Sequence, residues 1–393
     1  MRKLRLFSSA IALLIVMVTG CKDVTTEVAV RPTPANRAAR ISADQLDKLA
    51  RLWASRPAGF EQRLQEAADR FAAQHPEYRG VVKRALGAAE TACDANTPVN
   101  QWLSSEIADW RGTPIATYVL GLDMLNLPTY DALLFENSSA NQTFGPNGEY
   151  TQRLTKTFKD LKRFWNIDTD GMVLAAMHGR MLSDPERLYR TYLDAYGLSP
   201  ADAAYYTNFV LSVVQTFPQL RNGDHPIFTF NAFALEGFFF PPVGQIPNKI
   251  IMGDGFLQGL DAIGYGDVGP QAVLAHEFGH QIQFQLNLFG DEDTPEATRR
   301  TELMADAYSA YYLSHARGAS MQWKRVQQFL QVFYNIGDCS FTSPDHHGTP
   351  AQRMAAARWA YELADNAQKQ GHILTAQEFT ARFEAALPGI LAH

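Results

Sequence analysis

The sequence predicts an α+β fold that is mainly helical and has one small β element in its second half. Apolar residues recur at spacings of three and four over residues 42–89, a periodicity typical of amphipathic helices. Residues 101–125 and 151–220 continue this mostly helical pattern, whereas residues 226–240 are rich in phenylalanine and β-forming residues. Residues 249–252 form a short apolar run before a Gly-Asp-Gly turn, which predicts a strand.

Composition and charge exclude several classes of protein. The chain has 393 residues, of which 46% are hydrophobic and 19% charged. It can therefore bury a large core and is neither disordered nor a small disulfide scaffold. Its formal net charge is −6 and it has no dense run of lysine and arginine, which argues against nucleic acid as a partner.

The first twenty residues predict a signal peptide. Three basic residues precede an apolar run over residues 7–18, which is shorter than a typical transmembrane helix but matches the apolar part of a signal peptide. The run ends in Val18-Thr19-Gly20-Cys21, which resembles a bacterial lipobox, where cleavage leaves an acylated cysteine at the new N-terminus. We therefore expect lipidation at Cys21; an ordinary signal peptide with an incidental cysteine is the alternative.

A lipidated Cys21 would make the protein a membrane-anchored lipoprotein of the cell envelope that faces the periplasm. Lys22 rather than aspartate follows the cysteine, which favours the outer membrane over the inner membrane. Residues 21–40 contain prolines and small residues and predict a flexible tether. Export would also place Cys93 and Cys339 in an oxidising compartment, where a disulfide can form; two free buried thiols are the alternative.

Residues 276–280, with the sequence His-Glu-Phe-Gly-His, are the pattern that most strongly indicates chemistry. On a helix, His276 and His280 would lie roughly 40° apart around the axis and one turn apart along it, so both imidazoles can reach one ion. Glu277 would project near that ion without being forced to bind it, which suits a general base. Gly279 suits a position that a substrate or a second helix approaches closely. The alternative, a buried helix with two hydrogen-bonded histidines, leaves these three polar side chains unexplained.

A second helix is expected to supply a third metal ligand, because catalytic zinc sites usually have three protein ligands and one open position. Residues 294–296, Thr-Pro-Glu, are typical of a helix start, and the helix is expected to run to Arg317. Glu302 and Asp306 lie one turn apart on it. We expect Glu302 to bind the ion and Asp306 to accept a hydrogen bond from a ligand histidine; a charged, solvated helix face is the alternative.

Another histidine lies just before a predicted helix start. Thr349 and Gln352 form a capping-box pattern with Pro350 at the first helical position, which places His347 in the preceding loop. A histidine held there could donate a hydrogen bond to a developing oxyanion. A surface histidine is the alternative.

The order of these motifs resembles the bacterial neutral zinc metallopeptidases of the gluzincin type. The matching segments are His276-Glu277-x-x-His280-Gln281, Glu302-x-x-Ala305-Asp306, Ile336-Gly337-Asp338 and His347-Gly348-Thr349-x-x-Gln352-Arg353. Asn231-Ala232-Phe233-Ala234 and Ile250-Ile251-Met252-Gly253 further resemble the CAAX-protease-like metallopeptidases, in which such a strand precedes the helix with the two histidines. The resemblance covers about residues 225–360 and does not extend to residues 40–220.

The resemblance implies a zincin-like metallopeptidase core and one zinc ion. His276, His280 and Glu302 would hold the ion, Glu277 would activate its water, and His347 becomes a further catalytic candidate. The expected organisation is a signal peptide (1–20), a tether (21–40), a helical N-terminal region (41–220) and a zinc metallopeptidase domain (221–393).

The predicted function is zinc-dependent cleavage of a protein or peptide by a membrane-tethered endopeptidase. An extended substrate is expected to pair by its backbone with the strand at residues 249–253. One alternative is a non-catalytic envelope lipoprotein that binds a partner and has a structural or vestigial zinc site, although a structural site closes with a fourth ligand and needs no base such as Glu277. Another is hydrolysis of a non-peptide amide, such as a cell-wall crosslink.

Overall fold

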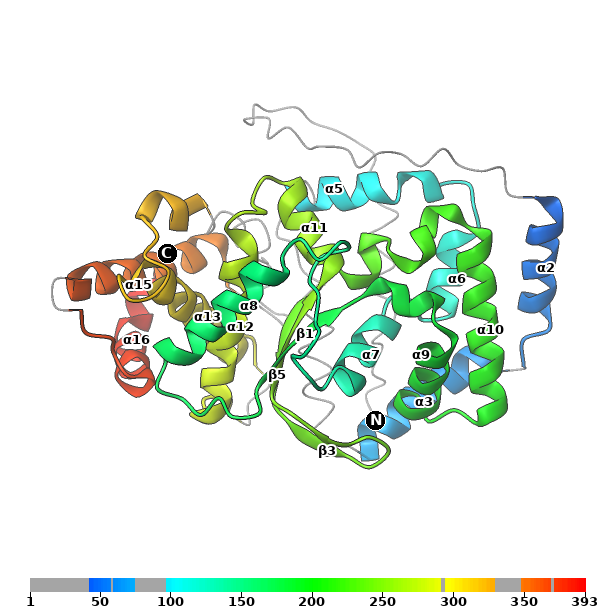
Figure 1. Ribbon diagram of the computed structural model, residues 1–393, viewed down its shortest axis with the longest axis horizontal. Coiled ribbons are helices and arrows are strands. Elements are labelled where there is room, and N and C mark those ends of the chain that lie inside the picture. The colour runs from blue at the N-terminus through cyan, green and yellow to red at the C-terminus, as the bar shows by residue number, and fades with distance from the viewer. Residues whose placement is uncertain (1–41, 58, 75–96, 291–293, 329–347, 369–370) are drawn as a thin grey trace.

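The computed structural model describes residues 42–57, 59–74, 97–290, 294–328, 348–368 and 371–393. Over these residues the fold is α+β and mainly helical, as the sequence predicts, with a small mixed sheet at its centre. Figure 1 shows a group of helices on each side of the sheet. The expected signal peptide and tether, with Cys21, and the thiols of Cys93 and Cys339 lie outside the described residues.

Three strands form the central sheet: β1 (Val173–Met177), β2 (Ala232–Leu235) and β5 (Lys249–Gly253). β5 is the middle strand, parallel to β1 on one side and antiparallel to β2 on the other. Every residue of the three strands is buried, as expected for a sheet with helices on both faces. A separate hairpin of β3 (Phe238–Phe240) and β4 (Gly244–Ile246) connects β2 to β5.

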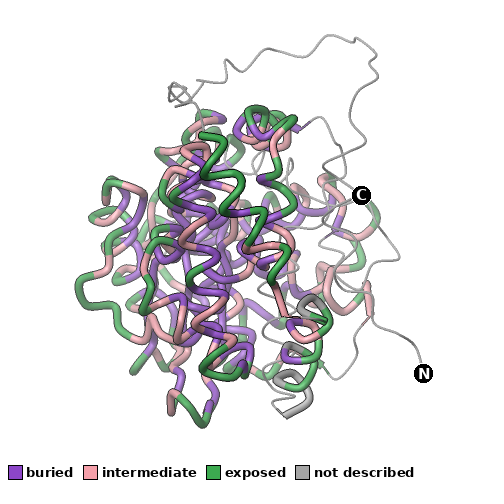
Figure 2. The backbone as a smooth tube through the Cα atoms, turned by 90° about the vertical axis from the view of Figure 1, so that its right-hand side faces the viewer, coloured by how far each residue is buried: buried purple, intermediate pink, exposed green. Residues whose placement is uncertain are grey.

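The two faces of the sheet belong to two different hydrophobic cores, because successive side chains of a strand point to opposite faces. Facing the first core are Val173, Ala175, Phe233 and Ile251. Facing the second core are Leu174, Ala176, Ile250 and Met252. Figure 2 shows the buried residues gathered in the interior beneath the exposed outer faces of the helices.

Each core is covered by its own helices. The first core includes residues of α2 (Ala43–Ala54), α3 (Phe60–Gln74), α6 (Ile115–Gly121), α7 (Leu127–Phe135), α9 (Pro185–Arg190) and α10 (Pro200–Thr216). The second includes residues of α8 (Thr151–Phe164), α11 (Asp254–Ala262), α12 (Gly269–Gln285), α13 (Pro295–Ser314), α15 (Pro350–Gln368) and α16 (Ala376–Leu391). Helix α5 (Pro98–Glu106) packs against α11. No helix in the described ranges is both long enough and apolar enough to cross a membrane.

Strand β1 lies in a region for which the sequence predicts mostly helix. Val173–Met177 is a short apolar run, and periodicity alone does not distinguish a fully buried strand from a helical segment. The strand expected at residues 249–252 is confirmed. Pro226–Thr229 form a 3-10 turn, so only the later part of residues 226–240 is extended.

The middle position of β5 shows that one expectation is wrong. Both edges of β5 are hydrogen-bonded to neighbouring strands, so an extended substrate cannot pair with residues 249–253. Within the described part of the chain β2 is an edge strand instead. The Gly253 N–H donates to Asn231 O at 2.9 Å, and this register turns the backbone polar groups of Ala232 and Ala234 away from β5.

Elements before and after residue 221 share one sheet and one core. β1 pairs with β5, and α8 packs against α12. Residues 41–220, expected as a helical N-terminal region, therefore supply one strand of the sheet and one helix of the second core.

The helices that carry the predicted motifs begin where the sequence predicts. The Thr294 hydroxyl accepts a hydrogen bond from Ala297 N–H at the start of α13. At the start of α15, Thr349 Oγ1 accepts from Gln352 N–H while Gln352 Oε1 accepts from Thr349 N–H, which completes the capping box. α13 ends at Ser314, three residues before the predicted end, because His315 is extended.

Candidate metal centre

Helix α12 carries both histidines through the interior of the second core. Most of its residues are buried, and the side chains of Val273, Leu274 and Phe278 pack into that core. A helix that is buried on most sides is stabilised by packing around its circumference rather than along a single apolar face. His276 is 4% exposed, so its imidazole is held within this packing rather than in solvent.

Gly279 allows α13 to approach α12 closely. A Cβ atom at this position would lie 3.1 Å from Ala305 Cα and 3.3 Å from Ala305 Cβ. Such distances are tighter than ordinary van der Waals contact, so a larger residue would push the two helices apart. The expectation that a second helix approaches at this glycine is confirmed, and the approach brings Glu302 to the histidines.

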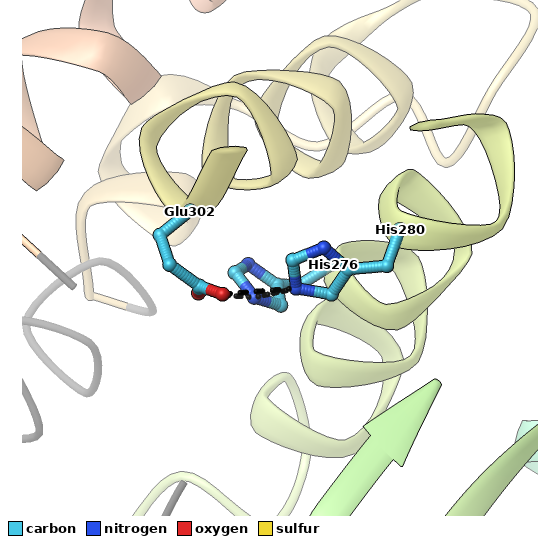
Figure 3. Close-up of side chains that lie close together, drawn as sticks. All are labelled: His276, His280 and Glu302. Atoms are coloured by element: carbon cyan, nitrogen blue, oxygen red, sulfur yellow. Dashed lines mark hydrogen bonds and ion pairs between the residues drawn. The ribbon is translucent and has the colours of Figure 1, made fainter. Parts of the chain in front are cut away.

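Figure 3 shows the side chains of His276, His280 and Glu302 pointing toward one another from α12 and α13. His276 Nε2 lies 3.2 Å from Glu302 Oε2, and His280 Nε2 lies 3.3 Å from Glu302 Oε1. The two Nε2 atoms lie 3.2 Å apart. Four tetrahedral ligands of a zinc ion, each about 2.0–2.1 Å from it, lie roughly 3.3 Å from one another. The three side chains could therefore hold one metal ion.

The outer nitrogens of both imidazoles already have acceptors. His276 Nδ1 lies 2.9 Å from Asp306 Oδ1, and His280 Nδ1 lies 2.8 Å from Gln283 Oε1. These acceptors place the ring proton of a neutral imidazole on Nδ1, so that each Nε2 presents a lone pair to the cluster. Two imidazole nitrogens and a carboxylate that converge inside a protein form a site that a cation would stabilise.

Asp306 is fully buried and is held by Arg353 from α15. Arg353 Nε donates to Asp306 Oδ2 at 2.6 Å, and its Nη2 donates to Asp306 Oδ1 at 2.7 Å. Burial raises the pKa of Asp306, but the Arg353 guanidinium outweighs burial and lowers it. The carboxylate is therefore ionised and fixes the orientation of the His276 ring, as expected for this residue from the sequence.

The cluster attracts positive charge. Burial lowers the pKa of His276, but its hydrogen bonds to Asp306 and Glu302 outweigh burial and raise the pKa to about 10. A bound proton relieves the repulsion among the acceptors in the same way as a metal cation would.

Glu277 is buried beside this cluster and next to the edge strand. Burial raises the pKa of its carboxyl group to about 8, while His276 and a backbone hydrogen bond from Ala234 in β2 oppose the rise. A carboxylate with a pKa raised this far accepts a proton readily near neutral pH, which suits a general base. β2 therefore lies directly beside the candidate base.

The sequence predicts no individual role for two residues that support the cluster, Arg353 and Gln283. Arg353 is only the last residue of a family motif, and Gln283 belongs to no motif. Both act through contacts between helices, which spacing along the chain does not reveal. The only local signal for Gln283 is its position three residues after His280, on the same face of α12.

His347 lies outside the described residues, as do Ile336, Gly337 and Asp338. The next residue, Gly348, is described and has a φ of +95°. A Cβ there would lie 3.0 Å from Leu303 Cδ2, so the chain after His347 packs against α13 beside Glu302.

Residues 40–220 supply one polar pair that the sequence did not predict. His178 Nδ1 lies 2.6 Å from Asp254 Oδ2, and Asp254 Oδ1 accepts from Gly145 N–H at 2.9 Å. These contacts join the end of β1 to the start of α11. They stabilise the end of the sheet and do not involve the metal centre.

No protein-family model, curated protein or solved structure matches this chain. Its function is therefore inferred from the geometry of the cluster and from the motifs in the sequence.

Proposed function

We propose that this protein is a zinc-dependent metallopeptidase. One observation supports the proposal most strongly: two imidazole lone pairs and a carboxylate converge at 3.2–3.3 Å, with the buried carboxyl group of Glu277 beside them. A structural zinc site would close its fourth position with another ligand, whereas a catalytic site leaves it open and places a base nearby. The three ligand side chains of His276, His280 and Glu302 are the number that such a catalytic site requires.

The zinc ion would be held by His276, His280 and Glu302 and, when bound, would polarise the attacking water and the scissile carbonyl. Glu277 takes the proton from that water and transfers it to the leaving amine. Asp306 keeps the His276 ring in the tautomer that presents Nε2 to the ion. Arg353 keeps Asp306 ionised during this step.

The substrate would bind along β2 as an added strand. Ala232 and Ala234 turn their backbone polar groups away from β5, and Ala234 also lies against Glu277. An extended peptide that pairs with this edge would bring one of its carbonyl groups to the base. Backbone pairing is tolerant of sequence, so the recognised class is an extended polypeptide rather than one particular side chain.

The anchoring of the protein is a separate part of the proposal. The apolar run and the Val18-Thr19-Gly20-Cys21 motif support an envelope lipoprotein that is lipidated at Cys21, faces the periplasm and is held at the outer membrane. Incorporation of a labelled fatty acid into the native chain tests this. A Cys21→Ser chain should incorporate none, and equal labelling of both chains would contradict the assignment.

The Glu277→Gln variant tests the catalytic proposal. It keeps the size of the side chain and all three ligands, so zinc content should equal that of the native protein. Cleavage of casein should fall by about 10²–10⁴-fold, because the general base is lost. Glu296→Gln, at an exposed position in the first turn of α13, is the matched control and should retain activity.

Full cleavage by zinc-loaded Glu277→Gln protein would refute the role of Glu277. A native protein that binds zinc but cleaves no peptide would favour the non-catalytic lipoprotein. Purified peptidoglycan, assayed beside casein, distinguishes peptide cleavage from hydrolysis of cell-wall crosslinks.

A further inference from the structure

The two histidines of the cluster are supported in different ways. His276 donates to a carboxylate, Asp306, that an arginine also contacts. His280 Nδ1 contacts instead the neutral amide of Gln283, at 2.8 Å from Oε1. Gln283 is 0% exposed, so no solvent competes for these hydrogen bonds.

Gln283 joins the two helices that carry the metal ligands. Its Nε2 donates to Thr301 O on α13 at 2.7 Å. Thr301 directly precedes Glu302, the third ligand of the cluster. One amide therefore contacts the ring of one ligand and the backbone next to another.

The partners of Gln283 determine its orientation and the position of the His280 proton. A backbone carbonyl only accepts, so the amide nitrogen must face Thr301 and the amide oxygen must face His280. His280 Nδ1 must then donate, which leaves Nε2 to face Glu302 and His276. A side chain with neither a donor nor an acceptor would control neither the ring tautomer nor the spacing between the helices.

We propose that Gln283 is a positioning residue that sets the zinc affinity of the cluster. It holds His280 in its ligand tautomer and holds Glu302 at the distance that the ion requires. The inference rests on the zinc site of the proposed function but not on peptide cleavage.

The test compares three variants with the native protein by competition against a chromogenic zinc chelator. Gln283→Met preserves length but removes donor and acceptor, and its Kd for zinc should rise by about 10–100-fold. Gln283→Glu keeps an acceptor for His280 but loses the donor to Thr301 O, so its affinity should lie between those of Gln283→Met and the native protein. Gln281→Met is the matched control: Gln281 lies on the same helix, is also 0% exposed and donates to Leu235 O and Lys249 O of the sheet rather than to α13. Its zinc Kd should not change.

A second readout separates positioning from general destabilisation. The visible spectrum of the Co²⁺-loaded protein reports ligand geometry and should change in Gln283→Met but not in Gln281→Met. Should Gln283→Met fail to fold, Gln283→Asn provides the same test, because an amide one methylene shorter cannot reach both partners.

Two results would overturn the inference. One is native zinc affinity in folded Gln283→Met protein, and the other is an equal loss of zinc affinity in Gln281→Met and Gln283→Met. A native protein that binds no zinc would overturn the proposed metal site as well. A native protein that binds zinc but cleaves no peptide would refute the proposed function without changing the zinc-affinity test of Gln283, so the two proposals fail separately.

Discussion

Two buried polar clusters lie on opposite faces of the sheet, and they differ in the hydrogen-bonding groups that they bring together. On the face of the first core, Lys249 is 0% exposed and its Nζ lies near the last carbonyls of α7, at 3.3 Å from Ala132 O, 3.0 Å from Leu133 O and 2.8 Å from Glu136 O. Burial lowers the pKa of Lys249 to about 7, and its Nζ donates to carbonyl oxygens that the end of a helix leaves unpaired. On the other face, the His276 cluster brings two imidazole nitrogens and a carboxylate within 3.2–3.3 Å of one another.

Under the proposed function, the difference separates a structural cluster from one that holds a metal ion. The Lys249 cluster is complete within the chain, so its role is to join β5 to α7. The His276 cluster could hold a metal ion. Behind it, Asp306 and Arg353 form a buried ion pair that is complete within the chain, like the contacts of Lys249. The predictions below test this distinction, beginning with the largest effect.

Replacing Arg353 with Met should have the largest effect on stability. It leaves Asp306 ionised, buried and without its guanidinium partner, and breaking a buried ion pair in this way costs about 3–5 kcal/mol. Urea denaturation should show this decrease in the free energy of unfolding. A decrease below about 1 kcal/mol would mean that the pair contributes little to stability.

Replacing Lys249 with Met should lower the free energy of unfolding by about 3 kcal/mol, because several buried carbonyls lose their shared donor. The same denaturation measurement applies. Zinc affinity should be unchanged, since the cluster lies on the other face of the sheet from the ligands. Weaker zinc binding in this variant would contradict the separation of the two clusters.

Adding zinc should stabilise the native protein by about 2.7 kcal/mol at a free concentration 100 times the Kd. Lys249→Met should gain the same amount, because the effects of distant sites add. Glu302→Ala lacks one ligand and should gain little. Thermal unfolding with and without zinc measures all three, and an equal gain in Glu302→Ala would exclude Glu302 as a ligand.

The smallest effect is expected at an exposed ion pair. Arg325 contacts Asp267, and the side chains are 49% and 53% exposed. Arg325→Ala should change the free energy of unfolding by less than about 1 kcal/mol, because solvent screens such pairs. This variant calibrates the denaturation series, and a larger loss would mean that charge alone, rather than burial, governs the effects above.

Features that depend on local spacing could be predicted from the sequence. The separation of His276 and His280 by one helical turn, the Thr294 cap of α13 and the capping box of α15 are all local patterns, and the structure contains each. The convergence of Glu302 on the histidines could also be predicted, because a catalytic zinc site needs a third protein ligand and a second helix was expected to carry it.

Features that depend on contacts between distant segments could not be predicted. The apolar run of β1 is compatible with helix or strand until β5 pairs with it, and the same pairing makes β5 a middle strand. Gln283 is an ordinary polar residue in sequence, and only Thr301 on the neighbouring helix gives it a role. Tertiary packing decided each of these.

The place of Arg353 in the chain has a consequence for biosynthesis. Its contact with Asp306 spans 47 positions, whereas His276 and Asp306 are 30 positions apart. A ribosome therefore completes the α12–α13 pair before it adds the guanidinium that neutralises the buried acid. Asp306 therefore gains its counter-charge only when α15 docks on α13.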